Sequence, residues 1–469
     1  MDTVNKKPNV VIIGAGPGGY TAAIRLGQLG MNPVVIEKEK VGGVCLNWGC
    51  IPTKTIYSTT EPLAKLDSWK KRGIEFNQPK ISLSDVTKHQ SKIANKLTDG
   101  VEKLIKSNGG TILYGKAEVT TGPKVIVKRI GKEEITLEPN NLIIASGSIP
   151  IELPEFVFSQ DGIWDSKTAV MPPETPEKLV ILGAGVIGLE MGTIYNRLGS
   201  EIKILEMQDS ILPTLNLDKR IASYLNRSLK KSGIDIYTST RAKELQTVEE
   251  KKMVIGEKDG KEVSIPADRV LVAVGRRPNL DFIDDQLGLE YNEGFIETDA
   301  SCLTSIENVY AIGDIAGGPM LAHKASKEAL IASSKITGEK ITNYKVVPSA
   351  VFTDPEYAQV GMSERKARQN GYEPVIGRFP LRASGKAVAM DEATGAIKLV
   401  GDKDTDRLLG GSILGPHASD MIAELALSIE TELTVTQIAE TIHPHPTLSE
   451  AIMEAAENVH SRAIHTSNR

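Results

Sequence analysis

Cysteine is scarce in this chain, with three residues among 469, at positions 45, 50 and 302. An odd number of thiols, two of them five positions apart, does not fit the disulfide framework of a secreted protein. The N-terminus, MDTVNKKPNVVIIGAG, has neither a secretory apolar region nor a cleavage-like site. No apolar run approaches the roughly 18 residues that span a bilayer. We therefore expect a cytoplasmic protein without a membrane segment.

A dominant charge sign is also lacking. The chain has 55 Lys and Arg against 60 Asp and Glu, and its formal net charge is −5. Acidic and basic residues are mixed along the chain, which argues against nucleic acid or a membrane surface as a partner. The composition, 40% hydrophobic and 25% charged, is typical of globular proteins, and the length favours about three domains.

An internal repeat organises the first half of the chain. Residues 10–38, VVIIGAGPGGYTAAIRLGQLGMNPVVIEK, match residues 179–207, LVILGAGVIGLEMGTIYNRLGSEIKILEM, at an offset of 169 residues. Each copy predicts a short buried strand, a glycine turn, an amphipathic helix and a second strand that ends in an acid. This is the pattern of a βαβ unit that binds a dinucleotide.

The glycines and the acid of each copy have separate physical tasks. The first glycine permits a tight turn, the second lets the backbone approach a pyrophosphate, and the third lets the helix pack on the strand. The helix N-terminus attracts the phosphates, and the acid accepts hydrogen bonds from ribose hydroxyls. The two copies predict two dinucleotide sites, built from Gly14, Gly16, Gly19 and Glu37, and from Gly183, Gly185, Gly188 and Glu206.

The second acid also discriminates between cofactors. Glu206 would repel a 2′-phosphate, and the residues that follow it, MQDSILP, include no Lys or Arg to bind one. The second site is therefore predicted to take NAD in preference to NADP.

Outside the repeats, the pattern predicts a long helix over residues 83–109 and alternating strands after it. Residues 251–265 predict a β-hairpin with an Asp-Gly turn. From about residue 347 the glycine fingerprints stop, and long strands alternate with amphipathic helices. We expect a different kind of domain there.

The thiol pair in GGVCLNWGCIPTK, residues 42–54, admits three interpretations. A metal site would need further ligands, but no His lies within thirty residues and the spacing is not CxxC. A structural disulfide across so short a loop would gain little entropy and would be unusual in a reducing compartment. A redox couple accounts for more features: the pair follows Glu37 closely, GGV offers a flexible approach, and IPTK predicts a helix start, where thiol pKa values fall.

A base for thiol chemistry is suggested near the C-terminus. PTLSEAIMEAAENV predicts a helix with Thr447 as its cap, His445 in the loop before it, and Glu450 in its first turns. A partnered carboxylate would orient the imidazole as a base near neutral pH. The alternative is a solvated histidine in a proline-rich loop beside a glutamate on the helix surface, and spacing alone does not decide between them.

Taken together, the motifs resemble the flavoprotein disulfide reductases, and within them the dihydrolipoamide dehydrogenases, over essentially the whole chain. The motifs are GAGPGG, CLNWGCIPTK, GAGVIGLE, VGRRPN, NVYAIGDIAG followed by LAHKA, and HPHPTLSE. The resemblance implies an α/β fold with two Rossmann-like dinucleotide-binding domains, for FAD and NAD, plus a C-terminal α+β dimerisation domain. The implied boundaries are 1–150 for the FAD domain, 151–279 for the NAD domain, 280–346 for a central segment completing the FAD site, and 347–469 for the interface domain.

The resemblance also implies an activity and catalytic roles. Cys45 would exchange with substrate and Cys50 would contact the flavin, while His445 and Glu450 of one subunit would serve Cys45 of its partner in a homodimer. The reaction would oxidise a protein-bound dihydrolipoyl group and reduce NAD. The partner would be a lipoyl-bearing acyltransferase or carrier protein of a 2-oxo acid or acetoin dehydrogenase complex, or of a glycine cleavage system.

The implied cofactor contacts follow the same motifs, and no metal ligand is implied. Lys54 would lie by the flavin, paired with Glu190, and a proline at position 444 departs from the small residue that is more frequent in the family. Cys302 is expected to be a buried apolar residue. The remaining contacts implied for FAD are Gly14, Gly16, Gly19, Glu37, Ala117, Gly147, Asp314 and Ala322, and those for NAD are Gly183, Gly185, Gly188, Glu206 and Gly275.

Two rival functions remain at this point. One is a related reductase acting on glutathione or a metal ion, against which Glu206 and the lack of a C-terminal cysteine pair argue. The other is a flavin-bearing subunit whose main role is docking to a multienzyme core.

Overall fold

The computed structural model describes residues 5–77, 79–249 and 251–468 of the chain. The chain forms two compact units, each assembled from three separate segments. None of the helices in the described part of the chain combines the length and the apolar character that crossing a bilayer demands. Unit 1 comprises Met1–Ile56, Ser84–Ile151 and Arg276–Tyr344, and unit 2 comprises Tyr57–Leu83, Glu152–Gly275 and Lys345–Arg469.

Unit 1 is built around a five-stranded parallel sheet in the order β20-β7-β1-β2-β3. Its strands are short runs rich in Val and Ile, as expected for strands that are buried on both faces. The strand at one edge, β20, comes from a segment far along the chain, so residues near position 310 complete the sheet. The strands are β1 (Val10–Ile13), β2 (Val34–Glu37), β3 (Thr111–Tyr114), β7 (Asn141–Ile144) and β20 (Val309–Ala311).

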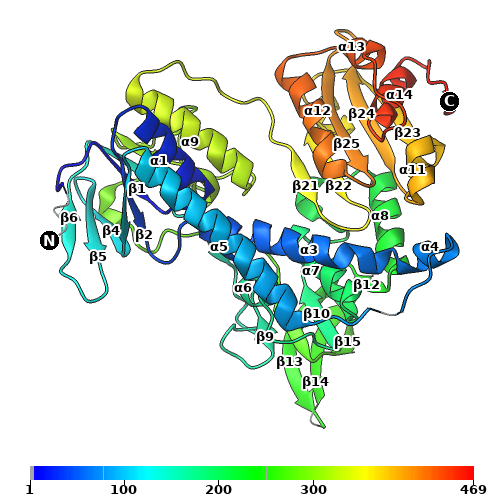
Figure 1. Ribbon diagram of the computed structural model, residues 1–469, viewed down its shortest axis with the longest axis horizontal. Coiled ribbons are helices and arrows are strands. Elements are labelled where there is room, and N and C mark those ends of the chain that lie inside the picture. The colour runs from blue at the N-terminus through cyan, green and yellow to red at the C-terminus, as the bar shows by residue number, and fades with distance from the viewer. Residues whose placement is uncertain (1–4, 78, 250, 469) are drawn as a thin grey trace. The chain divides into compact units, whose positions relative to one another are not determined.

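The alternation of side chains along β1 divides the core of unit 1 into two layers. Val10 and Ile12 pack with α1 (Pro17–Gln28) and α9 (Ala322–Thr337), which lie side by side (Figure 1). Val11 and Ile13 point to the opposite face, because successive side chains of a strand alternate. There they pack with a three-stranded antiparallel sheet of β4 (Lys116–Thr120), β5 (Lys124–Lys128) and β6 (Ile135–Leu137).

The other elements of unit 1 are helices and short strands outside the two sheets described above. The predicted helix after the thiol motif is confirmed as α5 (Leu83–Ser107). The remaining elements are α2 (Gly43–Trp48), β8 (Ser148–Pro150), β17 (Arg276–Pro278), η2 (Asp285–Leu287), β18 (Tyr291–Asn292), β19 (Phe295–Ile296) and η3 (Gly313–Ala316). Helix α3 (Cys50–Ala64) begins in unit 1 and ends in unit 2.

Unit 2 contains a second five-stranded parallel sheet, in the order β12-β11-β10-β16-β9. The predicted hairpin is confirmed as β14 and β15, joined at Asp259-Gly260. The elements of this part are α4 (Leu66–Lys71), β9 (Ile163–Trp164), α6 (Ser166–Val170), β10 (Lys178–Leu182), α7 (Val186–Arg197), β11 (Glu201–Leu205), η1 (Pro213–Leu215), α8 (Lys219–Lys231), β12 (Ile234–Tyr237), β13 (Thr240–Val248), β14 (Lys251–Lys258), β15 (Lys261–Pro266) and β16 (Arg269–Val272).

The C-terminal part of unit 2 is an antiparallel sheet, β21-β22-β25-β24-β23, with α12 packed on β22 and β25 and α14 packed on β23 (Figure 1). The predicted α/β class with a C-terminal α+β region is thus confirmed. The elements are β21 (Ser349–Val351), β22 (Tyr357–Gly361), α10 (Glu364–Gln369), β23 (Pro374–Pro380), η4 (Leu381–Ala383), α11 (Gly385–Met390), β24 (Ala396–Asp402), β25 (Leu408–Leu414), α12 (Ala418–Glu430), α13 (Val435–Glu440) and α14 (Glu450–Val459).

Candidate active site

The first and third glycines of the two fingerprints have matching steric environments. Gly14 and Gly183 have φ angles of +95° and +104°, a region that L side chains rarely adopt. A Cβ on Gly19 would lie 1.8 Å from the Gly14 carbonyl oxygen, and a Cβ on Gly188 would lie 2.0 Å from that of Gly183. These four positions therefore require glycine for the turn and for the contact between helix and strand.

The middle glycines have a different environment. A Cβ on Gly185 would meet nothing within 4 Å, and one on Gly16 would reach only the Cα of Gly43, at 4.0 Å. Both residues immediately precede a helix, and neither supplies a side-chain cap to α1 or α7. The space beside each helix N-terminus fits a pyrophosphate, which the backbone N–H groups there could bind.

The acids at the ends of β2 and β11 are held in the same way in both copies. Glu37 is 7% exposed, and its two oxygens accept from the N–H groups of Ala15 and Glu39, each at 2.8 Å. Glu206 is also 7% exposed and accepts from Ala184 at 2.7 Å and Gln208 at 2.8 Å. Each carboxylate is thus fixed beside its glycine turn, where its remaining lone pairs can accept from a ribose.

Around Asp314 the structure brings together residues that sequence reasoning missed. The Ser148 hydroxyl donates to Asp314, and the Arg276 side chain donates to the Ser148 hydroxyl at 2.8 Å and to its carbonyl at 2.6 Å. Gly147, just before Ser148, has a φ of +70°, as a tight turn requires. The 128 residues between Ser148 and Arg276 left no local signal of this pairing.

A buried ion pair supports the same loop from α9, which begins at Ala322. Lys324 and Glu328 have side chains only 5% and 8% exposed, and their charged atoms are 2.7 Å apart. The other Glu328 oxygen accepts from the N–H of Gly313 at 2.7 Å, and the Lys324 ammonium donates to the Gly313 carbonyl at 3.3 Å. The pair therefore fixes both backbone groups of the residue before Asp314.

The two thiols lie on successive helices rather than on a flexible approach. Gly42 and Gly43 are both left-handed, and Gly43 already begins α2, which carries Cys45. Helix α2 ends before Gly49, and Cys50 is the first residue of α3. The expectation of a flexible GGV segment was wrong, because the glycines are used for a sharp turn into α2.

Cys45 is half-buried and Cys50 is exposed, and the structure holds both as thiols. A hydrogen bond with Cys50, burial and the charge of Cys50 raise the pKa of the Cys45 thiol, while Lys54 opposes the increase. Burial and the charges of both cysteines also raise the pKa of Tyr20 on α1, which places this phenol beside the pair. The two thiols therefore lie near each other where α2 ends and α3 begins.

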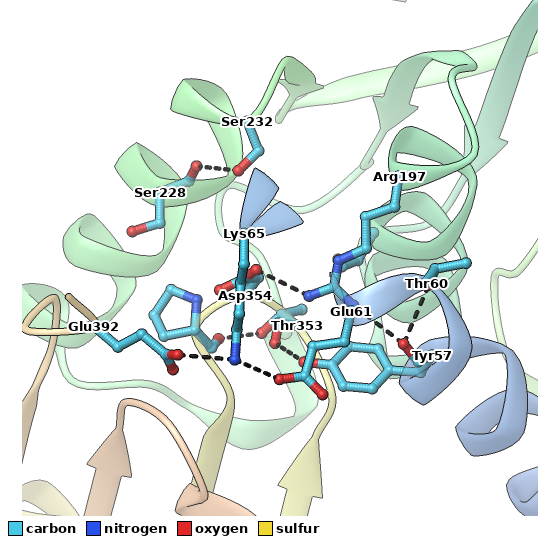
Figure 2. Close-up of polar contacts among 12 residues, drawn as sticks. Tyr57, Thr60, Glu61, Lys65, Arg197, Ser228, Ser232, Thr353, Asp354 and Glu392 are labelled. Carbon is cyan, nitrogen blue, oxygen red and sulfur yellow. Dashed lines mark hydrogen bonds and ion pairs between the residues drawn. The ribbon is translucent and has the colours of Figure 1, made fainter. Parts of the chain in front are cut away.

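Within unit 2, the second half of α3 is firmly anchored (Figure 2). The Tyr57 hydroxyl donates to the Thr353 carbonyl at 2.7 Å. The Arg197 guanidinium, at the end of α7, lies 4.4 Å from the Tyr57 ring centre and pairs with Asp354 at 2.9 Å. Glu190, also on α7, accepts from the Phe352 N–H at 3.1 Å. The helix that starts at Cys50 therefore has a fixed far end.

A second contact in Figure 2 anchors the end of α3. Lys65, the residue after α3, lies between Glu61 of that helix, at 2.7 Å, and Glu392, at 2.8 Å. The two carboxylates raise the pKa of Lys65 despite its partial burial, which lowers it.

The structure brings together the predicted base and its carboxylate. His445 Nδ1 lies 2.8 Å from Glu450 Oε1, and the other Glu450 oxygen accepts from the Thr447 N–H at 2.8 Å. Burial tends to raise the pKa of Glu450, but the Thr447 N–H, the hydrogen bond and charge of His445 and the charge of His443 outweigh it, so the pKa is lowered. The His445 side chain is 79% exposed, and Nε2 has no partner among the residues that the structure describes. Nε2 is thus available to accept a proton.

The predicted cap of this helix was wrong. Helix α14 begins at Glu450, its N-cap is Ser449, and no side chain caps it. The Thr447 hydroxyl donates instead to the Pro444 carbonyl at 2.7 Å. Thr447 therefore closes the loop that carries His445, and Glu450 holds this loop by accepting from the Thr447 N–H.

The remaining predicted residues are distributed over both compact units. Ala117 lies on β4, and Cys302 is 5% exposed, as expected of a buried residue. Cys45, Cys50 and Asp314 belong to unit 1, whereas Gly275, His445 and Glu450 belong to unit 2. Among the described residues no group of three or more His, Cys, Asp or Glu could hold a metal ion.

Residues 8–329 match the model of the pyridine nucleotide-disulphide oxidoreductase family. The chain belongs to this family. Residues 347–456 match the dimerisation domain of the same family, which corresponds to the C-terminal antiparallel sheet and its helices. The resemblance found in the motifs is thereby confirmed, the chain is an oxidoreductase, and its cofactors are FAD and NAD.

Individual members of the family are similar over nearly the whole chain. The dihydrolipoyl dehydrogenase of Geobacillus stearothermophilus is 43% identical over 458 residues, 97% of each chain. That of Halobacterium salinarum is 42% identical over 467 residues, 98% of each chain. Among solved structures, LpdA from Mycobacterium tuberculosis aligns with a TM-score of 0.88 and 25% identity, over 96% of this chain and 99% of that one. The HOCl-induced flavoprotein disulfide reductase RclA from Escherichia coli aligns with a TM-score of 0.86 and 26% identity, over 97% of this chain and 99% of that one.

Proposed function

We propose that this chain is an NAD-dependent dihydrolipoyl dehydrogenase. The observation that carries the proposal is the pair of neighbouring thiols at the end of α2 and the start of α3, in a chain 42–43% identical to dihydrolipoyl dehydrogenases over nearly its full length. Dihydrolipoamide loses two electrons and two protons to become a disulfide, while NAD takes up two electrons and one proton, and one proton is released.

The thiols divide the exchange between them. A substrate thiolate attacks Sγ of Cys45, the Cys45–Cys50 bond breaks, and Cys50 leaves as a thiolate. The second substrate thiolate then attacks the substrate sulfur bonded to Cys45, which releases lipoamide and Cys45. The closeness of the two thiols, with Cys50 as the first residue of α3, supports these roles. FAD, when bound, supplies the two-electron relay between this pair and NAD.

His445 accepts the protons of the substrate thiols at Nε2, because Glu450 holds Nδ1. Since the family's dimerisation domain includes these residues, we place His445 of the partner subunit beside Cys45 in a homodimer. Combining Cys45→Ser subunits with His445→Ala subunits then leaves one intact site per hybrid dimer, with about half of the wild-type turnover. An inactive hybrid would mean that each subunit uses its own histidine.

For the cofactors we propose the contacts implied by the motifs. Glu37 and Asp314 bind the ribose and ribitol of FAD, Lys54 lies by its reactive ring with Glu190 as partner, and Glu206 binds the ribose of NAD. The space at the middle glycines and the anchored acids support this assignment. Further backbone contacts are proposed for Gly14, Gly16, Gly19, Ala117, Gly147 and Ala322 with FAD, and for Gly183, Gly185, Gly188 and Gly275 with NAD.

We also propose the four-part domain division, 1–150, 151–279, 280–346 and 347–469. In its support, the chain passes between the two compact units at 151/152, 275/276 and 344/345, within a few residues of each boundary. The partner would be a lipoyl-bearing acyltransferase or carrier protein of a multienzyme complex in the cytoplasm.

The deciding experiment is a steady-state assay of the purified protein with dihydrolipoamide and NAD. We expect turnover that Cys45→Ser abolishes, and little or none with glutathione disulfide and NADPH. The opposite preference would make the chain a reductase of another substrate, and flavin binding without turnover of either would favour a docking role.

A further inference from the structure

The loop between α13 and α14 carries two histidines in contrasting environments. His445 is exposed, and only its Nδ1 is bonded, to Glu450. The His443 side chain is 6% exposed, and both of its nitrogens are bonded. Its Nδ1 lies 2.8 Å from the Thr441 carbonyl, and its Nε2 lies 2.9 Å from Oε1 of Glu424 on α12.

The partners of His443 determine its protonation. A carbonyl oxygen can only accept, so Nδ1 of His443 carries a proton. An ionised Glu424 also only accepts, so Nε2 must carry a second proton to bond with it. A neutral imidazole has one N–H and would lose one of the two contacts. The geometry therefore favours an imidazolium paired with a carboxylate.

We propose that His443 is a positioning residue: an imidazolium, held by Glu424 and the Thr441 carbonyl, that fixes the loop of His445 and keeps Glu450 ionised. That His445 accepts the proton rests on the proposed function, whereas the charge state of His443 does not.

The surrounding charges agree with this inference. The hydrogen bond to Glu424 raises the pKa of His443, burial opposes it, and the Thr441 carbonyl and the charges of Glu424 and Glu450 add to the increase. These are the groups that face the ring from α12, from α14 and from its own segment. In return, the charge of His443 helps to lower the pKa of Glu450. Without it, the carboxylate that orients His445 would be easier to protonate.

The first test observes the ring directly. The chain has seven histidines, so the holoenzyme with ¹⁵N-labelled histidine gives a small set of ring signals, and His443→Gln assigns the one of interest. At about pH 8, well above the ordinary histidine pKa of ~6.5, we expect both nitrogens of His443 to be protonated. A neutral ring at that pH would overturn the proposal, whether or not the protein oxidises dihydrolipoamide.

The second test separates charge from shape. Glu424→Gln keeps an acceptor of the same size but removes the negative charge, so His443 should lose its proton at a lower pH. We expect kcat to fall about tenfold near pH 8 and to stay within about twofold of wild type near pH 6, where the ring is charged in both proteins. Asp420→Asn, which removes an exposed carboxylate one turn earlier on the same helix, is the matched control and should leave the ratio of the two rates unchanged. An equal loss at both pH values would reduce Glu424 to a structural residue and overturn the proposal.

Discussion

Replacing Lys324 with methionine tests how the loop before Asp314 is held. The Lys324–Glu328 pair is almost fully buried, with its charges 2.7 Å apart. Removing one partner of a buried pair costs about 3–5 kcal/mol, because the remaining charge is left uncompensated. Against a typical net stability of about 5–15 kcal/mol, the free energy of unfolding of Lys324→Met should fall severely.

A double substitution decides whether charge is the cause. In Lys324→Met with Glu328→Gln no buried charge remains, and the Gln oxygen can still accept from the Gly313 N–H. We expect the double variant to lose only about 1–2 kcal/mol, roughly the value of the weakened hydrogen bonds.

The assay is urea unfolding of the FAD-bound protein, followed by flavin fluorescence and circular dichroism. Lys335→Met, an exposed lysine in the last turn of the same helix, is the control and should change stability by less than about 0.5 kcal/mol. The reasoning is refuted if Lys324→Met matches that control, or if the double variant is as unstable as the single one.

Three further predictions concern other parts of the chain. Gly188→Ala should lower the melting temperature, because its Cβ would lie 2.0 Å from the Gly183 carbonyl oxygen. Gly185→Ala has open space around its Cβ, so it should preserve the melting temperature and raise KM for NAD about tenfold. Folding raises the pKa of His443, so wild type should be more stable than His443→Gln. This difference in the free energy of unfolding should be fully present below about pH 6.5 and should be lost as the pH rises through the folded-state pKa. Urea unfolding midpoints of both proteins at several pH values measure it. Burial raises the pKa of Cys302 to about 12, so iodoacetamide at about pH 8 should alkylate the exposed Cys50 but not Cys302 in the folded reduced protein, as mass spectrometry would show. Equal labelling of Cys50 and Cys302 would contradict the burial of Cys302.

Local patterns in the sequence predicted local structure well. The repeat located both βαβ units, and the helices that start at Pro17 and Val186 follow its glycine turns as predicted. These features depend on residues within about 30 positions of one another, where periodicity and glycine placement carry the information. Thr447 shows the limit of such rules, because its hydroxyl donates to the Pro444 carbonyl and its oxygen accepts no N–H of the helix.

The supporting contacts were not predictable in this way. Ser148 meets Asp314 across 166 positions, and Tyr57 meets Thr353 across 296. His443 stood in a quoted motif, yet nothing in the motif indicated Glu424 on another helix as its partner. A serine, a tyrosine or a glutamate has no distinctive spacing when its partner is distant along the chain.

By itself, the sequence determined the chemistry of this protein: two dinucleotide sites, a thiol pair and a histidine with its carboxylate. Each of these is encoded in a short run of residues, because its steric and proton-transfer requirements are strict. Tertiary structure alone decided how these groups are held. The burial of Lys324 with Glu328, the anchoring of α3 through Tyr57 and Arg197, and the double hydrogen bonding of His443 depend on elements that meet only when the chain is folded, since burial and long-range pairing are properties of the packed molecule.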